Sequence, residues 1–185
     1  MNQTAQRFQD RARRFAEILD AVGDRWATST PCEGWTARDV VHHVIATERD
    51  FLARRGVDLG PDPDRSDPAA AWRAHASAVV DAVGRDGVAE TAYDGYFGPT
   101  TVADTLADFY GWDLVVHGWD VARATGQEWS ISDEEAAVLQ RTADGWGDAL
   151  HAEGICGPEL PVDADASAQD RLLARLGRDP RWSAA

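Results

Sequence analysis

Hydrophobic residues recur every three to four positions through most of this chain, and that is the period of an amphipathic α-helix. The pattern predicts helices over residues 4–22, 36–56, 72–84, 101–124 and 132–151, and a short helix after Ser167. Residues 56–67 are rich in Pro, Asp and Gly and are expected to form a loop. Residues 92–97 are expected to be a short extended piece, and longer strand alternation is missing from the sequence. We therefore predict an all-α, up-and-down bundle of four helices with an extra short C-terminal helix, and we rank an α/β fold below it.

Capping residues support several of the predicted helix ends. A Ser or Thr followed three positions later by an acidic residue is a capping pattern, and it occurs at Thr36, Ser132 and Ser167. Gly126 comes just after the 101–124 stretch and is expected to stop that helix.

Length and composition predict one globular domain over residues 1–185. A domain typically has roughly 150 residues, and the chain has 44% hydrophobic and 27% charged residues. We find neither an apolar stretch near the ~20 residues that a membrane helix needs nor a signal-peptide pattern. Cys32 and Cys156 have no metal-binding or redox spacing. We expect a soluble cytoplasmic protein.

Charge excludes several kinds of chemistry. The chain has 32 acidic and 18 basic residues, a net charge of −14, and every basic residue is arginine. Without lysine, Schiff-base and P-loop mechanisms are excluded. The acidic balance makes nucleic acid and anionic membranes poor partners, whereas a homodimer through an apolar helix face stays compatible with the sequence.

The predicted helix at 101–124 places charged residues on its apolar face. At one residue per 100°, Asp113, His117 and Asp120 fall on the side with the hydrophobic residues, while Gly111 and Val115 fall on the opposite side. An unpaired buried carboxylate costs several kcal/mol. We therefore expect an arginine, a hydrogen-bond network or a metal ion to compensate these carboxylates.

Asp113 and His117 are four residues apart, so their side chains can converge on one point. This spacing fits two metal ligands on one helix, and it equally fits a His–Asp hydrogen bond in a packed core. Gly111 and Gly118 each cost about 1 kcal/mol inside a helix. They suggest that a neighbouring segment or a ligand approaches closely there.

A third metal ligand would come from another helix. His42 and His43 lie symmetrically about the apolar face of the 36–56 helix, so the helical pattern does not choose between them. His75 flanks the apolar face of the next helix and is also usable. His151 ends its helix, where it is expected to interact with the helix dipole.

Three segments resemble the mycothiol-dependent maleylpyruvate isomerase N-terminal family, within the DinB-like metal-binding four-helix bundles. They are TPCEGWTARDVVHHV (30–44), DLVVHGWDVARATG (113–126) and DRLLARLGRDPRW (170–182). The resemblance implies a metal site at His43, Asp113 and His117, and so favours His43 over His42. The chain departs from the family in two ways: aspartate stands where relatives carry glutamate or histidine, and the isomerases have a further C-terminal domain.

The resemblance also implies a function. Three protein ligands leave a position open on a divalent ion, with zinc favoured and nickel as the alternative. The ion would activate a small-molecule thiol, mycothiol, to attack an electrophile in S-transfer or cis–trans isomerisation. Asp120 would orient a ligand histidine, or equally pair with Arg123 or Arg38. Two alternatives stay open: a non-catalytic metal-binding or sensing module, and a metal-free interaction bundle with a buried His–Asp network.

The sequence also leaves three tryptophans undecided. Trp35, Trp112 and Trp119 flank the proposed ligands along the chain, so they can line a pocket or belong to the core.

Overall fold

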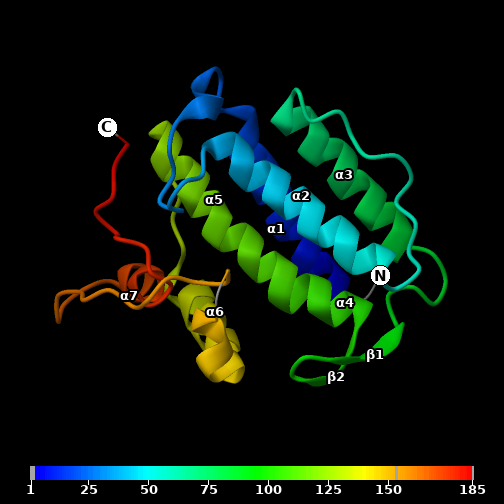
Figure 1. Ribbon diagram of the computed structural model, residues 1–185. Coiled ribbons are helices and arrows are strands. Elements are labelled where there is room, and N and C mark those ends of the chain that lie inside the picture. The colour runs from blue at the N-terminus through cyan, green and yellow to red at the C-terminus, as the bar shows by residue number, and fades with distance from the viewer. Residues whose placement is uncertain (1–2, 153, 185) are drawn as a thin grey trace.

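The computed structural model describes residues 3–152 and 154–184, and its main body is a bundle of four long helices (Figure 1). These helices are α1 (Gln3–Asp20), α2 (Ala37–Ala53), α3 (Pro68–Val83) and α5 (Gly111–Thr125). Helix α1 packs against α3 and α5, and so does α2, so the four form a closed ring around one hydrophobic core. The all-α fold class is confirmed.

The connection between α2 and α3 differs from a strictly alternating bundle. The loop 54–67 crosses back along the bundle, so α3 runs parallel to α2 (Figure 1). Arg38, in the first turn of α2, donates a hydrogen bond of 3.1 Å to the carbonyl oxygen of Ser66. Asp67 then caps α3 by accepting from the backbone N–H of Ala70. The prolines and glycines of this loop allow the long extended crossing.

The predicted helix at 101–124 is interrupted by a π-turn. It consists of α4 (Val102–Thr105), the π-turn Leu106–Tyr110 and α5. The additional residue in a π-turn rotates the helix after it relative to the helix before it. Phe109, which a regular helix would bury, is therefore 38% exposed.

Helix α5 is buried on almost every side. Gly111 and Val115 were predicted to face outward, but both are buried because α5 packs on α1 and α2, and the Arg11 side chain of α1 lies against Gly111. The left-handed conformation of Gly126 ends this helix as predicted.

A β-hairpin precedes α4. Strands β1 (Ala92–Gly95) and β2 (Gly98–Thr101) pair antiparallel, so the extended piece predicted at 92–97 is the first strand and the turn of a longer hairpin. The turn carries Tyr96 and Phe97, whose side chains are 87% and 54% exposed.

The C-terminal third of the chain covers one side of α5. It contains α6 (Asp133–Trp146), a 3₁₀ turn (Gly147–His151) and α7 (Ala168–Arg175), which packs on α6. Ser132 and Ser167 cap α6 and α7 as predicted. Helix α6 ends at residue 146, before the predicted 151, because Gly147 has a positive φ of 53°. The described helices include none that is long and apolar enough to cross a membrane.

Candidate metal centre

Three of the residues that the sequence singles out converge between α2 and α5. His43 comes from α2, and Asp113 and His117 lie one turn apart on α5. One nitrogen of each histidine and one oxygen of the aspartate lie within 4.8 Å of one another. The packing of α2 on α5 brings His43 to the pair formed by Asp113 and His117.

The other histidines lie elsewhere. His42 Nε2 lies 3.2 Å from the carbonyl oxygen of Arg65, in the loop before α3. His75 is buried on α3, where it pairs with Glu48. His151 Nδ1 lies 2.7 Å from the carbonyl oxygen of Gly157. Within the described residues, the structure therefore brings only His43 of these candidates to the Asp113–His117 pair.

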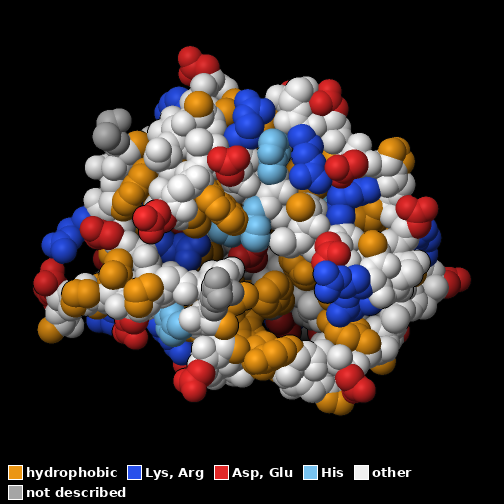
Figure 2. All heavy atoms as spheres, in the orientation of Figure 1, with side chains coloured by type: hydrophobic (Ala, Val, Ile, Leu, Met, Phe, Trp, Pro, Cys, Tyr) orange, Lys and Arg blue, Asp and Glu red, His pale blue; other side chains and the backbone are white. Residues whose placement is uncertain are grey.

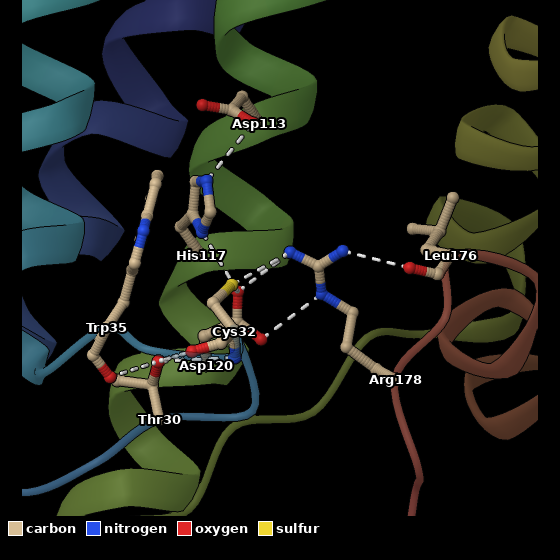
Figure 3. Close-up of polar contacts among 8 residues, drawn as sticks. All are labelled: Thr30, Cys32, Trp35, Asp113, His117, Asp120, Leu176 and Arg178. Atoms are coloured by element: carbon tan, nitrogen blue, oxygen red, sulfur yellow. Dashed lines mark hydrogen bonds and ion pairs between the residues drawn. The ribbon is translucent and has the colours of Figure 1, made fainter. Parts of the chain in front are cut away.

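The two ring nitrogens of His117 face different partners (Figure 3). Nδ1 lies 2.9 Å from Oδ2 of Asp120, and Nε2 lies 3.4 Å from Oδ1 of Asp113. A carboxylate on one imidazole nitrogen fixes the tautomer and the ring plane, and it leaves the other nitrogen free to bind a metal. Asp120 therefore orients His117 toward Asp113 and His43.

Asp120 is fully buried, and an arginine from the far end of the chain compensates its charge. Arg178 Nε donates to Oδ1 at 3.2 Å, and Nη2 donates to Oδ2 at 3.0 Å. This forked contact is the geometry in which a guanidinium binds a carboxylate best. It holds the pKa of Asp120 well below its usual value, although burial alone would raise it.

The arginine that pairs with Asp120 is therefore not one of the two named from the sequence. Arg123 donates to the carbonyl oxygen of Trp182, and Arg38 contacts the loop before α3. Arg178 lies beyond α7 and is 58 residues from Asp120 along the chain. The helical period of the sequence does not predict a contact between residues this far apart.

Cys32 is a further member of this network. Its thiol donates to Oδ2 of Asp120 at 3.2 Å and accepts from Nη2 of Arg178 at 3.3 Å (Figure 3). Neither Cys32 nor Arg178 was predicted to contribute to the site. Both lie inside the segments 30–44 and 170–182 that carry the family resemblance, which is the signal that points to them.

The short loop before α2 holds Cys32 and Trp35 in place. Thr30 Oγ1 donates to the carbonyl oxygen of Trp35 at 3.0 Å and accepts from the backbone N–H of Cys32 at 3.2 Å. The Trp35 ring centroid then lies 4.6 Å from that of His43 and 6.1 Å from that of His117. Trp35 therefore forms one wall of the centre.

The other two tryptophans considered from the sequence are core residues. Trp112 Nε1 donates to the carbonyl oxygen of Leu139 at 3.1 Å, and Trp119 is 2% exposed.

Two three-donor clusters share His117, and Arg178 distinguishes them. Cys32, His117 and Asp120 form the second cluster, with donor atoms again within 4.8 Å of one another. Its negative charge already has the guanidinium as a partner. The cluster of His43, Asp113 and His117 has no such arginine among the described residues, so it is the one that fits a metal ion.

The electrostatics of the cluster of His43, Asp113 and His117 also suit a cation. Burial lowers the pKa of His43, and this favours the neutral imidazole that binds metals. Burial also opposes protonation of His117, but the charge of Asp113 and hydrogen bonds to Asp120 and Cys32 outweigh it and raise the pKa of His117 well above its usual value. The site around His117 thus attracts positive charge.

The donor set fits a divalent metal on three grounds. Two imidazoles and one carboxylate are a set that zinc uses in catalytic sites. The 3.4 Å between His117 Nε2 and Asp113 is longer than an ordinary hydrogen bond. The described residues provide no hydrogen bond to the His43 ring, which contacts Trp35 and His117 through its faces and edges.

The family model of the mycothiol maleylpyruvate isomerase N-terminal domain matches residues 8–122 of the chain. The chain belongs to this family. The matched stretch begins within α1 and ends at residue 122, near the end of α5, so it includes His43, Asp113, His117 and Asp120, whereas Arg178 lies beyond it.

Two mycobacterial proteins are similar along nearly the whole chain. They are uncharacterized proteins of Mycobacterium tuberculosis strains CDC 1551 and H37Rv, each 28% identical in an alignment 183 positions long that covers 95% of this chain and 96% of the relative. The similarity therefore extends beyond the residues 8–122 that the family model matches. No solved structure matches the chain significantly.

Proposed function

We propose that the protein binds a divalent metal ion, zinc before nickel, through His43, Asp113 and His117, and that it activates a small-molecule thiol. The observation that carries this proposal is the convergence of the three donor atoms within 4.8 Å of one another in a member of this family. The family name supports mycothiol as the thiol. The reaction would be S-transfer to an electrophile or cis–trans isomerisation by thiol addition and loss.

When bound, a divalent ion would lower the pKa of a thiol and hold it as the thiolate. The donor set supports this chemistry because Asp113 supplies one negative charge and the two histidines are neutral ligands. The set therefore leaves positive charge for a thiolate to balance. Three protein ligands also leave a coordination position for that sulfur.

The remaining residues orient the donors and limit access of water. Asp120 holds His117 through Nδ1, and Arg178 and Cys32 in turn hold Asp120. Trp35 covers the imidazoles on one side. The two cysteines are free thiols, in keeping with a protein of the cytoplasm, where thiols are kept reduced.

One observation favours a second candidate function, a metal-free bundle. His117 lies between Asp113 and Asp120, so an imidazolium there would balance both carboxylates without an ion. A metal-binding or sensing module without turnover is the other alternative.

Metal content separates the metal-free alternative from the other two. In protein purified without a histidine tag, we expect about one zinc or nickel ion per chain. His43→Ala and His117→Ala should lose the metal, and His42→Ala should keep it. His42 is a matched control because it is the neighbouring histidine on α2 and contacts a loop carbonyl instead. Retention of metal in all three variants would refute the assignment.

Turnover separates an enzyme from a binding module. The metal-loaded protein should accelerate the reaction of mycothiol with members of a panel of alkylating and conjugated electrophiles, and His117→Ala should not. A metal-loaded protein that gives only the uncatalysed thiol rate with every electrophile would favour the module.

A further inference from the structure

The two cysteines of the chain meet at one arginine. Cys32 lies in the loop before α2, and Cys156 lies in the loop between the 3₁₀ turn and α7. Arg178 Nη2 donates to the sulfur of Cys32 at 3.3 Å, and the same guanidinium hydrogen-bonds to the side chain of Cys156. The sequence spacing of the two cysteines gives no sign of this contact. The fold therefore places both thiols of the chain on one guanidinium.

A close backbone contact holds Cys156 beside Arg178. Gly157 and Gly177 are the chain neighbours of these two residues, and their backbones pack directly against each other. A Cβ atom at Gly177 would lie 2.7 Å from the Cα atom of Gly157, which is too close for any side chain. The backbone N–H of Cys156 also donates to the carbonyl oxygen of Leu150 at 3.1 Å. The position of this thiol is therefore set by the fold of the C-terminal third.

Cys32 is held from the side of the bundle. Its backbone N–H donates to Thr30 Oγ1 at 3.2 Å, and its thiol donates to Oδ2 of Asp120 at 3.2 Å. The sulfur thus lies between a carboxylate and the Arg178 guanidinium (Figure 3). A thiol sulfur is only a weak acceptor. An oxygen added to this sulfur would accept a stronger, charge-assisted hydrogen bond from the guanidinium.

Both thiols can be reached by a small reagent. Each cysteine is half-buried, and each lies in a loop and not in a helix. Figure 2 shows histidine side chains at the surface near the centre of this face, so the site is not sealed from solvent. The loops allow the backbone to adjust to the Cα separation of about 4.4–6.8 Å that a disulfide needs.

We propose that Cys32 is an oxidation site for peroxides, and that Cys156 then joins it in a disulfide beside the Arg178 guanidinium. The bond would link the loop before α2 to the C-terminal third of the chain. Disulfides of this kind in a reducing compartment are usually transient and are used in catalysis or redox sensing. The inference does not involve a metal ion and is independent of the proposed function.

The chemistry balances with hydrogen peroxide as the oxidant. The sulfur of Cys32 takes one oxygen from the peroxide and becomes a sulfenic acid, and the other oxygen leaves as water. The sulfur of Cys156 then attacks the sulfur of Cys32 and breaks its S–O bond. The departing hydroxide takes the thiol proton of Cys156 and leaves as a second water. Each sulfur is oxidised by one electron, and the two peroxide oxygens are reduced.

The surroundings of the two thiols indicate the order of the steps. Burial raises the pKa of the Cys156 thiol, and the charge and hydrogen bond of Arg178 oppose this only in part. Since the thiolate is the reactive form, Cys156 is the slower of the two to meet peroxide. Cys32 therefore reacts first, and Cys156 reacts with the sulfenic acid formed beside it.

Peroxide treatment of the full chain, followed by peptide mapping without reductant, tests the proposal. We expect a monomer in which the peptide of Cys32 is cross-linked to that of Cys156. The temperature of unfolding should rise by several degrees, because the bond closes a long loop of the unfolded chain. A dithiol reductant should reverse both changes. Cys156→Ser should stop at the sulfenic acid of Cys32, which dimedone traps.

The double variant Cys156→Ser/Val162→Cys is the matched control. It keeps two thiols, but the second is at an exposed position of the C-terminal third, where Val162 is 39% accessible. Its disulfide should form at least about tenfold more slowly, because the fold no longer holds the sulfurs at a high effective concentration. The proposal is overturned if the control matches the wild-type rate. It is also overturned if the wild type keeps both thiols or forms only cross-links between two chains.

Zinc content and disulfide formation fail separately. A chain that binds no zinc but forms the bond between Cys32 and Cys156 would refute the proposed function and support this inference. A chain that binds zinc through the three donors but keeps both thiols under peroxide would support the metal centre and refute the oxidation site.

Discussion

Two histidine–carboxylate pairs are buried in this bundle, and they have opposite surroundings. His117 lies 2.9 Å from Asp120, and His75 lies 2.8 Å from Glu48, with every one of these residues 5% exposed or less. The second nitrogen of His117 faces Asp113 across an open cluster of donors. The second nitrogen of His75 and the second oxygen of Glu48 have no partner among the described residues.

The difference lies in what compensates each carboxylate. Arg178 holds the pKa of Asp120 well below its usual value, whereas burial, only partly opposed by His75, raises the pKa of Glu48. The first pair keeps a permanent charge and can orient a metal ligand. The second pair is a sealed polar contact between α2 and α3. Burial and pairing are therefore common to both pairs, which differ in the arginine that holds Asp120 and in the further donors, His43 and Asp113, beside His117.

The largest expected effect comes from removing Arg178, the cation that pairs with Asp120. Arg178→Ala should lower the free energy of unfolding by about 3–5 kcal/mol, because Asp120 would stay buried without its ion pair. Urea unfolding of the metal-free protein, followed by circular dichroism, measures the change. Arg123→Ala is the control, since Arg123 donates hydrogen bonds to the backbone carbonyl oxygen of Trp182 in the same C-terminal segment. Equal stability of the two variants would contradict the assigned role of Arg178.

The next effect tests how closely the chain packs beside His117. A Cβ atom at Gly118 would overlap the ring of Trp129, so Gly118→Ala should cost about 2–3 kcal/mol through overpacking. Gly145→Ala is the control, because Gly145 also lies in a helix but has open space around it. That variant should gain up to about 1 kcal/mol. Thermal unfolding of both variants would show opposite signs, and a destabilised Gly145→Ala would weaken the argument.

Neutralising the carboxylate of each pair should change the zinc affinity for the first pair and leave it unchanged for the second. Asp120→Asn should reduce zinc affinity about 10–100-fold, since a neutral amide replaces the charged acceptor that orients His117. Glu48→Gln should leave zinc affinity unchanged, because Glu48 contacts His75 and none of the three donors. Competition with a chromophoric chelator gives both dissociation constants. Equal losses in the two variants would remove the distinction between the pairs.

The smallest effect is a pH dependence of the second pair. The raised pKa of Glu48 means that the folded state binds this proton more tightly than the unfolded state. Stability that Glu48 contributes at low pH is therefore lost as the pH rises through the raised pKa. As the pH rises above the unfolded pKa of a glutamate, about 4.3, the wild type should therefore lose stability relative to Glu48→Gln.

Asp39→Asn is the control for this pH dependence. Hydrogen bonds from Thr36 lower the pKa of Asp39, so its contribution is complete above the unfolded pKa and constant over the same window. Urea unfolding at each pH gives both differences. A wild type that gains stability relative to Glu48→Gln as the pH rises would show the opposite sign and refute the pKa shift.

The candidate metal centre was only partly predictable. Asp113 and His117 can be paired from helical spacing, because residues four apart share one face in any regular helix. His43 required the family resemblance, because helix periodicity placed His42 and His43 equally well. Trp35 was one of three candidates until the loop around Thr30 placed it against both imidazoles. The regular helical pattern failed at Phe109, where the π-turn shifts the register.

The sequence by itself determined the helices, their caps, the stop at Gly126 and the pair of donors on α5, because these depend on residues close together along the chain. Only the tertiary structure decided that Arg178 and Cys32 hold Asp120, and that Glu48 closes off His75. It also decided that Cys156 lies beside the same guanidinium as Cys32. These contacts join segments up to 146 residues apart. Their partners are chosen by packing and by the cost of leaving buried charge unpaired, and no local pattern records that choice.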